Sequence, residues 1–509
     1  TEQEVVTFNG TWARERHKTS RQVGRGIFIN DSKGGSSSHE RNPFLLIKGK
    51  EVYGFNLVYS GNHKEVAECG ESGRMRVLTG LNDYLFDWTL APGESFYAPE
   101  AVMACAPDED ALSARMHAFV AEHIVRGKWK KRERPVLFNN WEGTYFDFNA
   151  EKIEEMARAA AALGAELFVL DDGWFGHRND DTSSLGDWFD NVEKTGGGLA
   201  ALAERVRAQG LSFGIWVEPE AVSPKSRLFA AHPDWAITEP CREPVYGRNE
   251  LLLDLTRPEV RDYIVESVAG VLDSAEISYV KWDMNRQMAG VGGAFAHRYI
   301  LGLYEVLHRI FDKRPEILFE SCSSGGNRFD LGMLCFSPQI WASDDTDPIE
   351  RLDIQKGLSY LYPLSTMGAH VSASPHAQTL RRTPLDTRFA VSCFGCLGYE
   401  LDLRELTPVE LKEARRQIAF YKKHRMTLQY GRLYRFELPD GREAFSCVAR
   451  DGSEAVTGHF RRLVHAAPPF EKLPAAGLDP GALYEVESRP PLLRIADFGA
   501  LIKHALPVK

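Results

Sequence analysis

The 509-residue sequence contains no long apolar run. A helix that spans a membrane needs about 18 or more consecutive apolar residues, and no stretch of the chain approaches that length. Residues 1–30 also lack the apolar core of a secretory signal peptide. We therefore expect no membrane partner and predict a cytoplasmic location.

Acidic residues outnumber basic ones, 71 to 61, which gives a formal net charge of -10, and apart from the short basic segment RGKWKKRERP (126–135) the charges are spread along the chain. Proteins that bind nucleic acid or anionic membranes usually carry clustered positive charge. The sequence therefore argues against a nucleic-acid partner, and a neutral small molecule is easier to reconcile with its charge.

The sequence also lacks the cysteine spacing of a disulfide framework or of a zinc site. Its eight cysteines are dispersed over a long chain, so we interpret them as reduced. Cys393 and Cys396 form a C-x-x-C motif without a second pair or a nearby His, and we favour core packing over a metal or redox role. A phosphate-binding loop and a dinucleotide fingerprint are absent too. We expect no cofactor and no metal.

The sequence pattern changes twice along the chain. Up to about residue 125, short runs such as FLLIKGK alternate apolar and polar residues, which is typical of antiparallel β-structure. Between residues 126 and 427, eight compact apolar runs, the last being RFAVSCFGCLGYELD, alternate with helical stretches and predict a (β/α)8 TIM barrel. Short alternating runs return from residue 428. We predict an α/β protein with an N-terminal β-sandwich (1–125), a catalytic barrel (126–427) and a small C-terminal antiparallel β domain (428–509).

Polar and aromatic residues follow six of the eight predicted strands. In a barrel of this kind, the chemistry lies where the strands end at the C-terminal rim. Carboxylates are rarely buried without partners, so several of them at one rim indicate a site. In strand order, these residues are Asn140 and Trp141; Asp171, Asp172 and Trp174; Trp216, Glu218 and Glu220; Lys281 and Asp283; Glu320 and Cys322; and Trp341, Asp344, Asp345 and Asp347.

Lys281 and Asp283 stand two residues apart at the end of the fourth predicted strand. Side chains alternate along a strand, so both point the same way. The ammonium group would lower the pKa of the carboxyl, which suits a nucleophile better than an acid. Asp347 is interpreted differently, because Pro348 follows it and an Asp in that position commonly caps the next helix.

These residue types point to glycoside hydrolysis. Two carboxyl groups are enough for that reaction, since one attacks or activates water and the other protonates the leaving oxygen. Aromatic rings hold the apolar face of a sugar, while Asp, Lys and Arg bind its hydroxyls. A single tryptophan is more often part of the core, but Trp141, Trp174 and Trp216 at three successive strand ends predict a sugar-stacking wall.

Five segments occur in order along the predicted barrel: LDDGWFGHRNDDTSSLGDW (170–188), GIWVEPE (214–220), YVKWDMNR (279–286), ESCSSGGNRFDLGML (320–334) and WASDDTDPIERL (341–352). Together with NGTWARERH near the start and MGAHVSASP at 367–375, they resemble the α-galactosidases of glycoside hydrolase family 36. The resemblance implies a retaining, exo-acting hydrolase. Such an enzyme releases terminal α-linked galactose from oligosaccharides of the melibiose and raffinose type through a covalent galactosyl-aspartate.

By position, the resemblance implies that Asp283 of KWD is the nucleophile and that Asp344, the first Asp of SDDTD, is the acid/base. Asp345 remains the rival for the second role, because the sequence does not say which neighbour faces the cleft. Asp171 and Asp172 match the pair that binds the axial 4-hydroxyl and the 6-hydroxyl of galactose.

The resemblance also implies the remaining sugar-binding residues. Lys281 matches the family's sugar-binding lysine, Trp216 its subsite tryptophan, and Arg248 in YGRNELLLDL its arginine. Trp141 fits an aromatic lid. Cys322 and Gly325 of the CSSGG segment fit the neighbourhood of the 2-hydroxyl.

Relatives of this type are usually longer at the N-terminus, where a full β-sandwich precedes the barrel. The chain, which does not begin with Met, is expected to enter that sandwich partway through. In some relatives this domain contributes to tetramer contacts and to the neighbouring active site, so the resemblance implies a homo-oligomer.

Other interpretations stay open. An α-N-acetylgalactosaminidase would need space beside the 2-substituent near Cys322, and an α-galactosyl transglycosylase would let a sugar instead of water resolve the intermediate. From a different class, the carboxylates could hold a divalent metal, as in barrel lyases and isomerases. A sugar-binding protein without activity is a further alternative. The ordered motifs favour the hydrolase.

Overall fold

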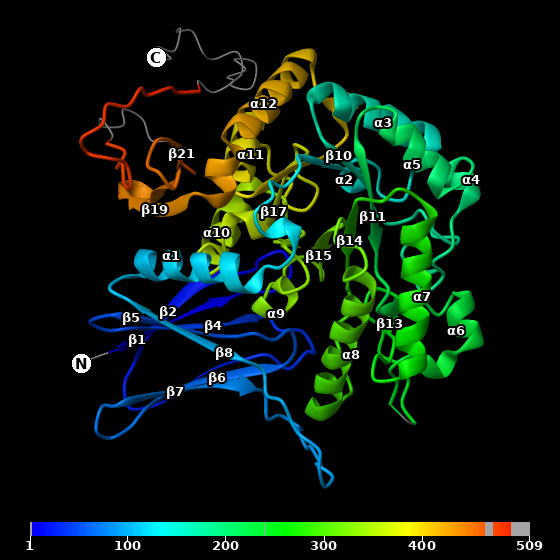
Figure 1. Cartoon of the computed structure of the whole chain (residues 1–509), viewed down its shortest axis with the longest axis horizontal. Helices are drawn as coiled ribbons and strands as arrows, with labels where there is room; N and C mark the ends of the chain where they lie inside the picture. Colours follow the sequence, from blue (N-terminus) through cyan, green and yellow to red (C-terminus); the bar gives the residue numbers. More distant parts are fainter. Residues whose placement is uncertain (1–2, 240, 464–471, 490–509) are drawn as a thin grey trace.

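The computed structural model describes residues 3–239, 241–463 and 472–489. A closed barrel of eight parallel strands forms its largest part, and an N-terminal pair of sheets and a C-terminal three-stranded sheet pack against one side of it (Figure 1). The predicted fold class is confirmed. The predicted domain limits themselves stay predictions.

The N-terminal strands form two antiparallel sheets, with the orders β2-β1-β4-β5-β8 and β3-β6-β7. Alternation along the strands sorts their side chains. Val5 and Leu45 pack between the two sheets, whereas Val6 and Leu46 join the main core on the opposite face. The strands are β1 (Gln3–Asn9), β2 (His17–Val23), β3 (Gly26–Asp31), β4 (Arg41–Lys48), β5 (Val52–Leu57), β6 (His63–Cys69), β7 (Met75–Leu81) and β8 (Ala101–Ala106).

The barrel strands are continuous apolar runs, because both of their faces are covered. All four residues of β10 are buried, for example. The first strand, β9, pairs with both β10 and β18 and so closes the barrel. The strands are β9 (Leu137–Asn139), β10 (Leu167–Leu170), β11 (Ser212–Val217), β14 (Tyr279–Trp282), β15 (Leu318–Ser321), β16 (Gln339–Trp341), β17 (Met367–Ser372) and β18 (Cys396–Glu400).

Helices connect the barrel strands and cover their outer faces (Figure 1). Asp347 caps α10 as predicted: its Oδ1 accepts from Ile349 N at 2.8 Å, with Pro348 at the first helical position. The longer helices are α3 (Ala150–Leu163), α5 (Leu199–Arg207), α7 (Pro258–Ser274), α8 (Gly293–Phe311), α10 (Pro348–Leu358), α11 (Leu385–Ser392) and α12 (Pro408–Tyr430), and the short ones are α2 (Trp141–Thr144), α4 (Val192–Thr195), α6 (Arg227–Ala231) and α9 (Leu331–Leu334).

The last predicted strand was too long. The segment RFAVSCFGCLGYELD begins inside α11, and only Cys396–Glu400 is a strand. A fully apolar run has no period that separates a buried helix from a buried strand. Cys393 and Cys396 are both buried, and Cys396 Sγ lies 3.2 Å from the Ser365 carbonyl oxygen, which agrees with core packing.

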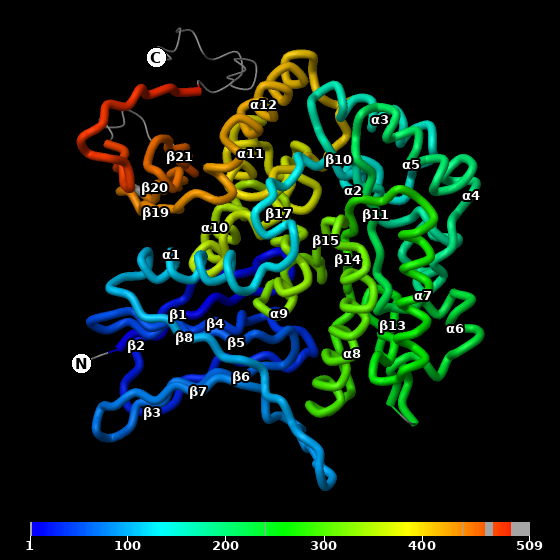
Figure 2. The backbone as a smooth tube through the Cα atoms, in the orientation of Figure 1, coloured from blue at the N-terminus to red at the C-terminus, as the bar shows by residue number. Residues whose placement is uncertain are grey.

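The C-terminal strands β19 (Arg432–Leu438), β20 (Arg442–Val448) and β21 (Ala455–Phe460) form an antiparallel sheet beside α12 (Figure 2). Arg435 links this sheet to α1 (Glu109–Phe119), because its Nη2 donates to Asp110 Oδ1 at 2.7 Å. Residues 464–471 and 490–509 of the predicted C-terminal domain lie outside the described residues.

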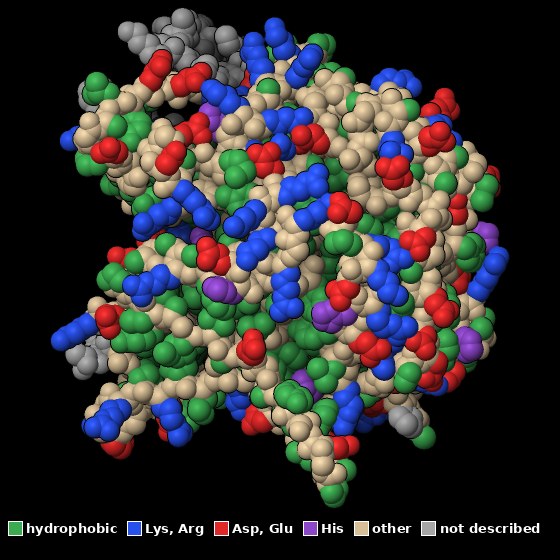
Figure 3. All heavy atoms as spheres, in the orientation of Figure 1, with side chains coloured by type: hydrophobic (Ala, Val, Ile, Leu, Met, Phe, Trp, Pro, Cys, Tyr) green, Lys and Arg blue, Asp and Glu red, His purple; other side chains and the backbone are tan. Residues whose placement is uncertain are grey.

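Acidic and basic side chains are mixed over the face of the molecule seen in Figure 3. Among the described residues, no helix combines the length and the apolar character needed to cross a membrane.

Candidate active site

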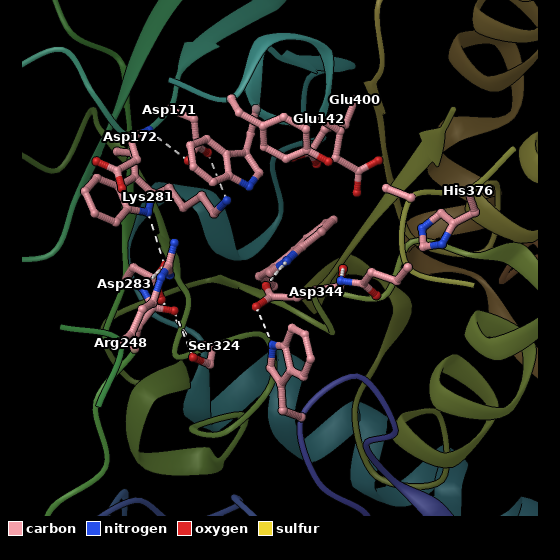
Figure 4. A pocket seen from close by; sticks show the side chains of 18 residues that line it. Glu142, Asp171, Asp172, Arg248, Lys281, Asp283, Ser324, Asp344, His376 and Glu400 are labelled. Carbon is pink, nitrogen blue, oxygen red and sulfur yellow. Dashed lines mark hydrogen bonds and ion pairs between the residues drawn. The ribbon is translucent and has the colours of Figure 1, made fainter. Parts of the chain in front are cut away.

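A cavity of about 400 Å³ opens at the C-terminal ends of the barrel strands (Figure 4). Eight of the ten predicted site residues line it: Trp141, Asp171, Asp172, Trp216, Arg248, Lys281, Asp283 and Asp344. These side chains come from sequence positions more than 200 residues apart, and the barrel brings their strand ends to one mouth.

Asp283 lies directly after β14 and is held by four donors. Its Oδ1 accepts from Met284 N at 2.8 Å and from Ser324 N at 3.2 Å, and its Oδ2 accepts from Trp216 Nε1 at 3.2 Å and Asn285 Nδ2 at 2.9 Å. Burial by itself would raise the pKa of this carboxyl. The positive charges of Lys281 and Arg248 and the Asn285 hydrogen bond instead lower the pKa of Asp283 below its ordinary value.

Asp344 follows β16 and is held by two indole groups. Trp341 Nε1 donates to its Oδ1 at 3.1 Å, and Trp12 Nε1 donates to its Oδ2 at 2.9 Å. Burial and the negative charge of Asp283 raise the pKa of Asp344, against the opposing hydrogen bond from Trp12. Two carboxyl groups in one cavity therefore have proton affinities shifted in opposite directions.

Asp345, the rival of Asp344, turns away from the cavity. It is buried and does not line the cavity, and its Oδ1 accepts from Asp347 N at 2.9 Å. Its role is to order the turn into α10, while its neighbour faces the open space.

Lys281 points into the cavity beside Asp283, as strand alternation predicts, but its direct partner is Asp171. Lys281 Nζ lies 2.9 Å from Asp171 Oδ2, and both side chains are buried. Lys281 thus acts on Asp283 through its charge and not through a hydrogen bond, since the structure gives no direct bond between the two described side chains. Burial raises the pKa of Asp171, although Lys281 opposes the shift.

Asp172 is fixed by a residue that sequence reasoning missed. Arg178 Nε and Nη2 each donate at 2.9 Å to one oxygen of its carboxylate. The arginine is fully buried, and such a bidentate pair fixes both position and charge. Asp172 is therefore held in one orientation at the cavity wall.

Arg248 reaches the cavity from a tight turn, residues 247–250, that lies at the end of the long connection between β12 (Ala221–Val222) and β13 (Leu251–Leu252). Arg248 and Asn249 both have positive φ, 50° and 62°, and Gly247 and Glu250 exchange backbone hydrogen bonds around them. A turn with two left-handed residues usually contains glycine. Holding an arginine there costs backbone strain, and such strain is common at functional sites.

Two of the three tryptophans of the predicted sugar-stacking wall reach the cavity, and their contact with a sugar stays a prediction. Trp141 and Trp216 line the cavity. Trp174 does not: it is fully buried, its Nε1 donates to the Trp216 carbonyl oxygen at 2.9 Å, and it packs against Phe175. The positive φ of Gly173 (110°) turns the chain so that Trp174 enters the core.

Cys322 and Gly325 lie behind the cavity surface. Cys322 is buried, and burial, together with the nearby charges of Asp283 and Asp344, raises the pKa of its thiol well above the ordinary value. Gly325 has a φ of 76°, and a Cβ there would lie 2.8 Å from Asp344 N and 2.7 Å from Glu15 Oε1. The glycine lets the two segments approach closely, and Ser324 beside it lines the cavity.

Several lining residues were not predicted as site residues: Trp12, Glu142, Tyr145, Asn285, Ser324, Trp341, His376, Ala377, Gln378 and Glu400. Strand-end reasoning applies to at least three of them: Trp341, already named as a strand-end residue, ends the sixth strand, Glu400 ends the eighth, and His376 follows the seventh. Strand-end reasoning does not reach Trp12, which lies outside the barrel, although Trp12 belongs to the NGTWARERH segment that carries the family resemblance.

Glu142 and Glu400 form a second carboxyl pair on the side of the cavity that carries Asp344 (Figure 4). Burial and the charge of Glu400 raise the pKa of Glu142 well above its ordinary value. Burial opposes ionisation of Glu400 as well, but His370, whose Nδ1 lies 2.7 Å from Glu400 Oε2, lowers the pKa of Glu400. Among the described residues, no three His, Cys, Asp or Glu side chains are grouped as in a metal site.

Models of three protein families match the chain. The Melibiase family covers residues 95–431, the glycosyl hydrolase family 36 N-terminal domain covers residues 1–91, and the family 36 C-terminal domain covers residues 442–500.

Two similar curated proteins are alpha-galactosidases. AgaA of Geobacillus stearothermophilus is 48% identical over 501 residues, 95% of this chain and 69% of the relative. Mel36A of Lactobacillus acidophilus is 45% identical over 500 residues, 95% of this chain and 68% of the relative. The crystal structure of an AgaA variant in complex with raffinose has a TM-score of 0.92 and 46% identity, with 94% of this chain and 69% of that chain covered. An AgaA variant in complex with stachyose has a TM-score of 0.91 and the same identity and coverage.

Proposed function

The chain belongs to glycoside hydrolase family 36, and on this premise we propose that it is a retaining α-galactosidase that removes terminal galactose from raffinose-type oligosaccharides. The complexes of similar alpha-galactosidases with raffinose and stachyose support this substrate class. The charge and lining of the cavity suit a neutral, hydroxyl-rich ligand.

The observation that carries the proposal is the opposite tuning of two carboxyl groups in one cavity. The pKa of Asp283 is lowered, so it is ionised and able to attack. Burial and the charge of Asp283 raise the pKa of Asp344, which favours the protonated form that an acid needs. When the surroundings of two carboxyl groups shift their pKa values in opposite directions, the group with the lower pKa suits the nucleophile and the group with the higher pKa suits the acid of a glycosidase.

In the first step, a carboxylate oxygen of Asp283 attacks the anomeric carbon. The bond to the leaving oxygen breaks, and that oxygen takes the proton of Asp344. The galactosyl group is then joined to Asp283 with inverted configuration. Asp344 is left ionised next to the departing sugar.

In the second step, Asp344 takes a proton from water. The water oxygen attacks the anomeric carbon, the bond to Asp283 breaks, and α-galactose is released. Two inversions restore the original configuration, and Asp344 regains the proton that it gave in the first step.

Selectivity for galactose follows from Asp171 and Asp172. Their carboxyl oxygens suit hydrogen bonds to the axial 4-hydroxyl and to the 6-hydroxyl. With the 4-epimer, the acceptors stay unpaired in a buried site, which is costly.

The test is hydrolysis of melibiose, raffinose and nitrophenyl α-galactoside by the purified chain, with nitrophenyl α-N-acetylgalactosaminide in parallel. We expect turnover of the three galactosides, little of the N-acetyl substrate, and α-galactose as the first anomer in the proton NMR spectrum. β-Galactose as the first product would exclude the retaining mechanism. Preference for the N-acetyl substrate would exclude the substrate assignment.

The cytoplasmic location and the homo-oligomer stay predictions. Light scattering of the purified chain measures the second directly.

A further inference from the structure

A loop from the N-terminal sandwich reaches the barrel cavity. It connects β1 to β2, and we call residues 10–16 the β1–β2 loop. Trp12 on this loop donates its indole N–H to Asp344 Oδ2 at 2.9 Å, across 332 positions of sequence. The side chain of Trp12 is 49% exposed, so its contact with Asp344 does not follow from burial in a core.

Glu15 connects the same loop to the segment that carries Asp344. Its Oε2 accepts from Ser343 Oγ at 2.5 Å, and Ser343 Oγ in turn accepts from Asp345 N at 3.1 Å. Glu15 is fully buried, and its other oxygen, Oε1, has no hydrogen-bond partner. The loop is therefore bonded to Asp344 itself and, through Glu15, to the residues on both sides of it.

Arg16 connects the base of the loop to the barrel through hydrogen bonds. Its guanidinium donates to the Ser38 carbonyl oxygen at 2.9 Å and also to the Gly326 carbonyl oxygen. The residue is 1% exposed, and a Cβ at Gly357 would lie 1.7 Å from the Arg16 carbonyl oxygen. The base of the loop is therefore in close contact with Gly357 and bonded to Gly326, so a shift of the loop would disturb both contacts.

We propose that the β1–β2 loop is a positioning element for the proton donor, in which Trp12 and Glu15 set the orientation and the proton affinity of Asp344 from outside the barrel. The inference rests on the proposed role of Asp344 as the acid/base. The N-terminal sandwich thus contributes to the reaction, because its loop supplies a hydrogen bond to Asp344 that no described barrel residue makes from the same position.

Trp12 and Glu15 act on Asp344 with opposite signs. The indole N–H of Trp12 stabilises the ionised carboxylate and so lowers the pKa of Asp344. Burial raises the pKa of Glu15 to about 7, and its negative charge above that pH opposes ionisation of Asp344. The other charged or titratable groups that face Asp344 or its segment are Asp283, Glu142, Glu400, Lys281, Arg248, Cys322, Arg351 and His376.

Because Trp12 and Glu15 shift the pKa of Asp344 in opposite directions, replacing each of them should have opposite effects on the pH profile. Hydrolysis requires protonated Asp344, so the alkaline limb of the kcat/KM profile follows its pKa. Trp12→Phe keeps the ring and removes the N–H, and we expect the alkaline limb to move to higher pH. Glu15→Gln removes the charge, and we expect the limb to move to lower pH. A structural defect alone would not shift the alkaline limb to higher pH in one variant and to lower pH in the other.

A second readout is the dependence on the leaving group. Melibiose has a poor leaving group that needs the proton, whereas nitrophenolate leaves without much help. Misplacement of Asp344 should lower kcat on melibiose several-fold more than on nitrophenyl α-galactoside. The controls are Trp88→Phe, the same substitution away from the cavity, and Arg14→Gln, an exposed change on the same loop. Neither should change the profile.

An unchanged alkaline limb and an unchanged leaving-group ratio in folded Trp12→Phe would overturn the inference, even if Glu15→Gln fails to fold. A wild-type chain without activity on either galactoside would instead overturn the proposed function. In that case, the pKa of Asp344 is measured by carbon-13 NMR of aspartate-labelled protein, with Asp344→Asn for assignment. An equal pKa in the wild type and in Trp12→Phe would again exclude the loop effect.

Discussion

The two sides of the cavity treat the same functional group differently (Figure 4). On the first side, Asp283 lies near the cationic groups of Lys281 and Arg248 and accepts a hydrogen bond from Asn285, and its pKa is lowered. On the second side, Asp344 lies with Glu142 and Glu400, and burial and the charge of Asp283 raise its pKa.

The difference shows that the role of an aspartate in this cavity depends on its neighbours. Each side also has a different origin. The donors to Asp283 all come from barrel segments, whereas one of the two donors to Asp344 comes from the N-terminal sandwich. The surroundings of the proposed nucleophile therefore come from the barrel alone, whereas those of the proposed acid come from the barrel and the N-terminal sandwich.

Removal of the nucleophile should have the largest effect. We expect Asp283→Ala to lower kcat by on the order of 10⁴-fold or more, because no other described carboxylate in the cavity combines lowered proton affinity with this position. Azide fits the space that the carboxylate leaves and attacks from the same face, so the rescued product should be β-galactosyl azide. Detection of α-galactosyl azide by NMR would contradict the assignment.

Removal of the acid should have a smaller effect that depends on the leaving group. We expect Asp344→Ala to lower kcat on melibiose by roughly 10²–10⁴-fold and to lower kcat much less on nitrophenyl α-galactoside. Asp283 still forms the intermediate, so azide should give α-galactosyl azide, the opposite anomer.

Asp345→Ala is the matched control for this comparison. Its carboxylate bonds Asp347 N and does not line the cavity, so the loss should not depend on the leaving group. A strong leaving-group dependence in Asp345→Ala, with none in Asp344→Ala, would exchange the two roles.

Removal of the cation should move both limbs of the pH profile. Lys281 lowers the pKa of Asp283 and of Asp344. Because hydrolysis needs Asp283 ionised and Asp344 protonated, Lys281→Met should shift the acid and the alkaline limbs of kcat/KM to higher pH. The buried Asp171 also loses its partner, so we expect the free energy of unfolding to fall by about 3 kcal/mol.

The matched control is Lys356→Met. Lys356 pairs with Glu437 at 2.9 Å and does not line the cavity, so both limbs should stay in place. If the limbs of Lys281→Met also stay in place, the lysine has no part in separating the two proton affinities.

Strand-end reasoning could predict most of the site, because it depends on local rules. Apolar runs mark the strands, alternation places Lys281 and Asp283 on one face, and parallel strands bring their ends to one rim. The exceptions follow from turns. Trp174 follows the end of its strand just as Asp171 and Asp172 do, but the turn at Gly173 directs its side chain into the core.

The sequence by itself determined the barrel, the strand ends that carry the chemistry and the cap of α10 by Asp347, since these depend on neighbours along the chain. Only the tertiary structure decided which partner each group meets: Asp171 for Lys281, Arg178 for Asp172, and Trp12 for Asp344. It also decided that Asp344 and not Asp345 lines the cavity. Such contacts depend on packing between segments that are distant in sequence, and no local periodicity encodes them.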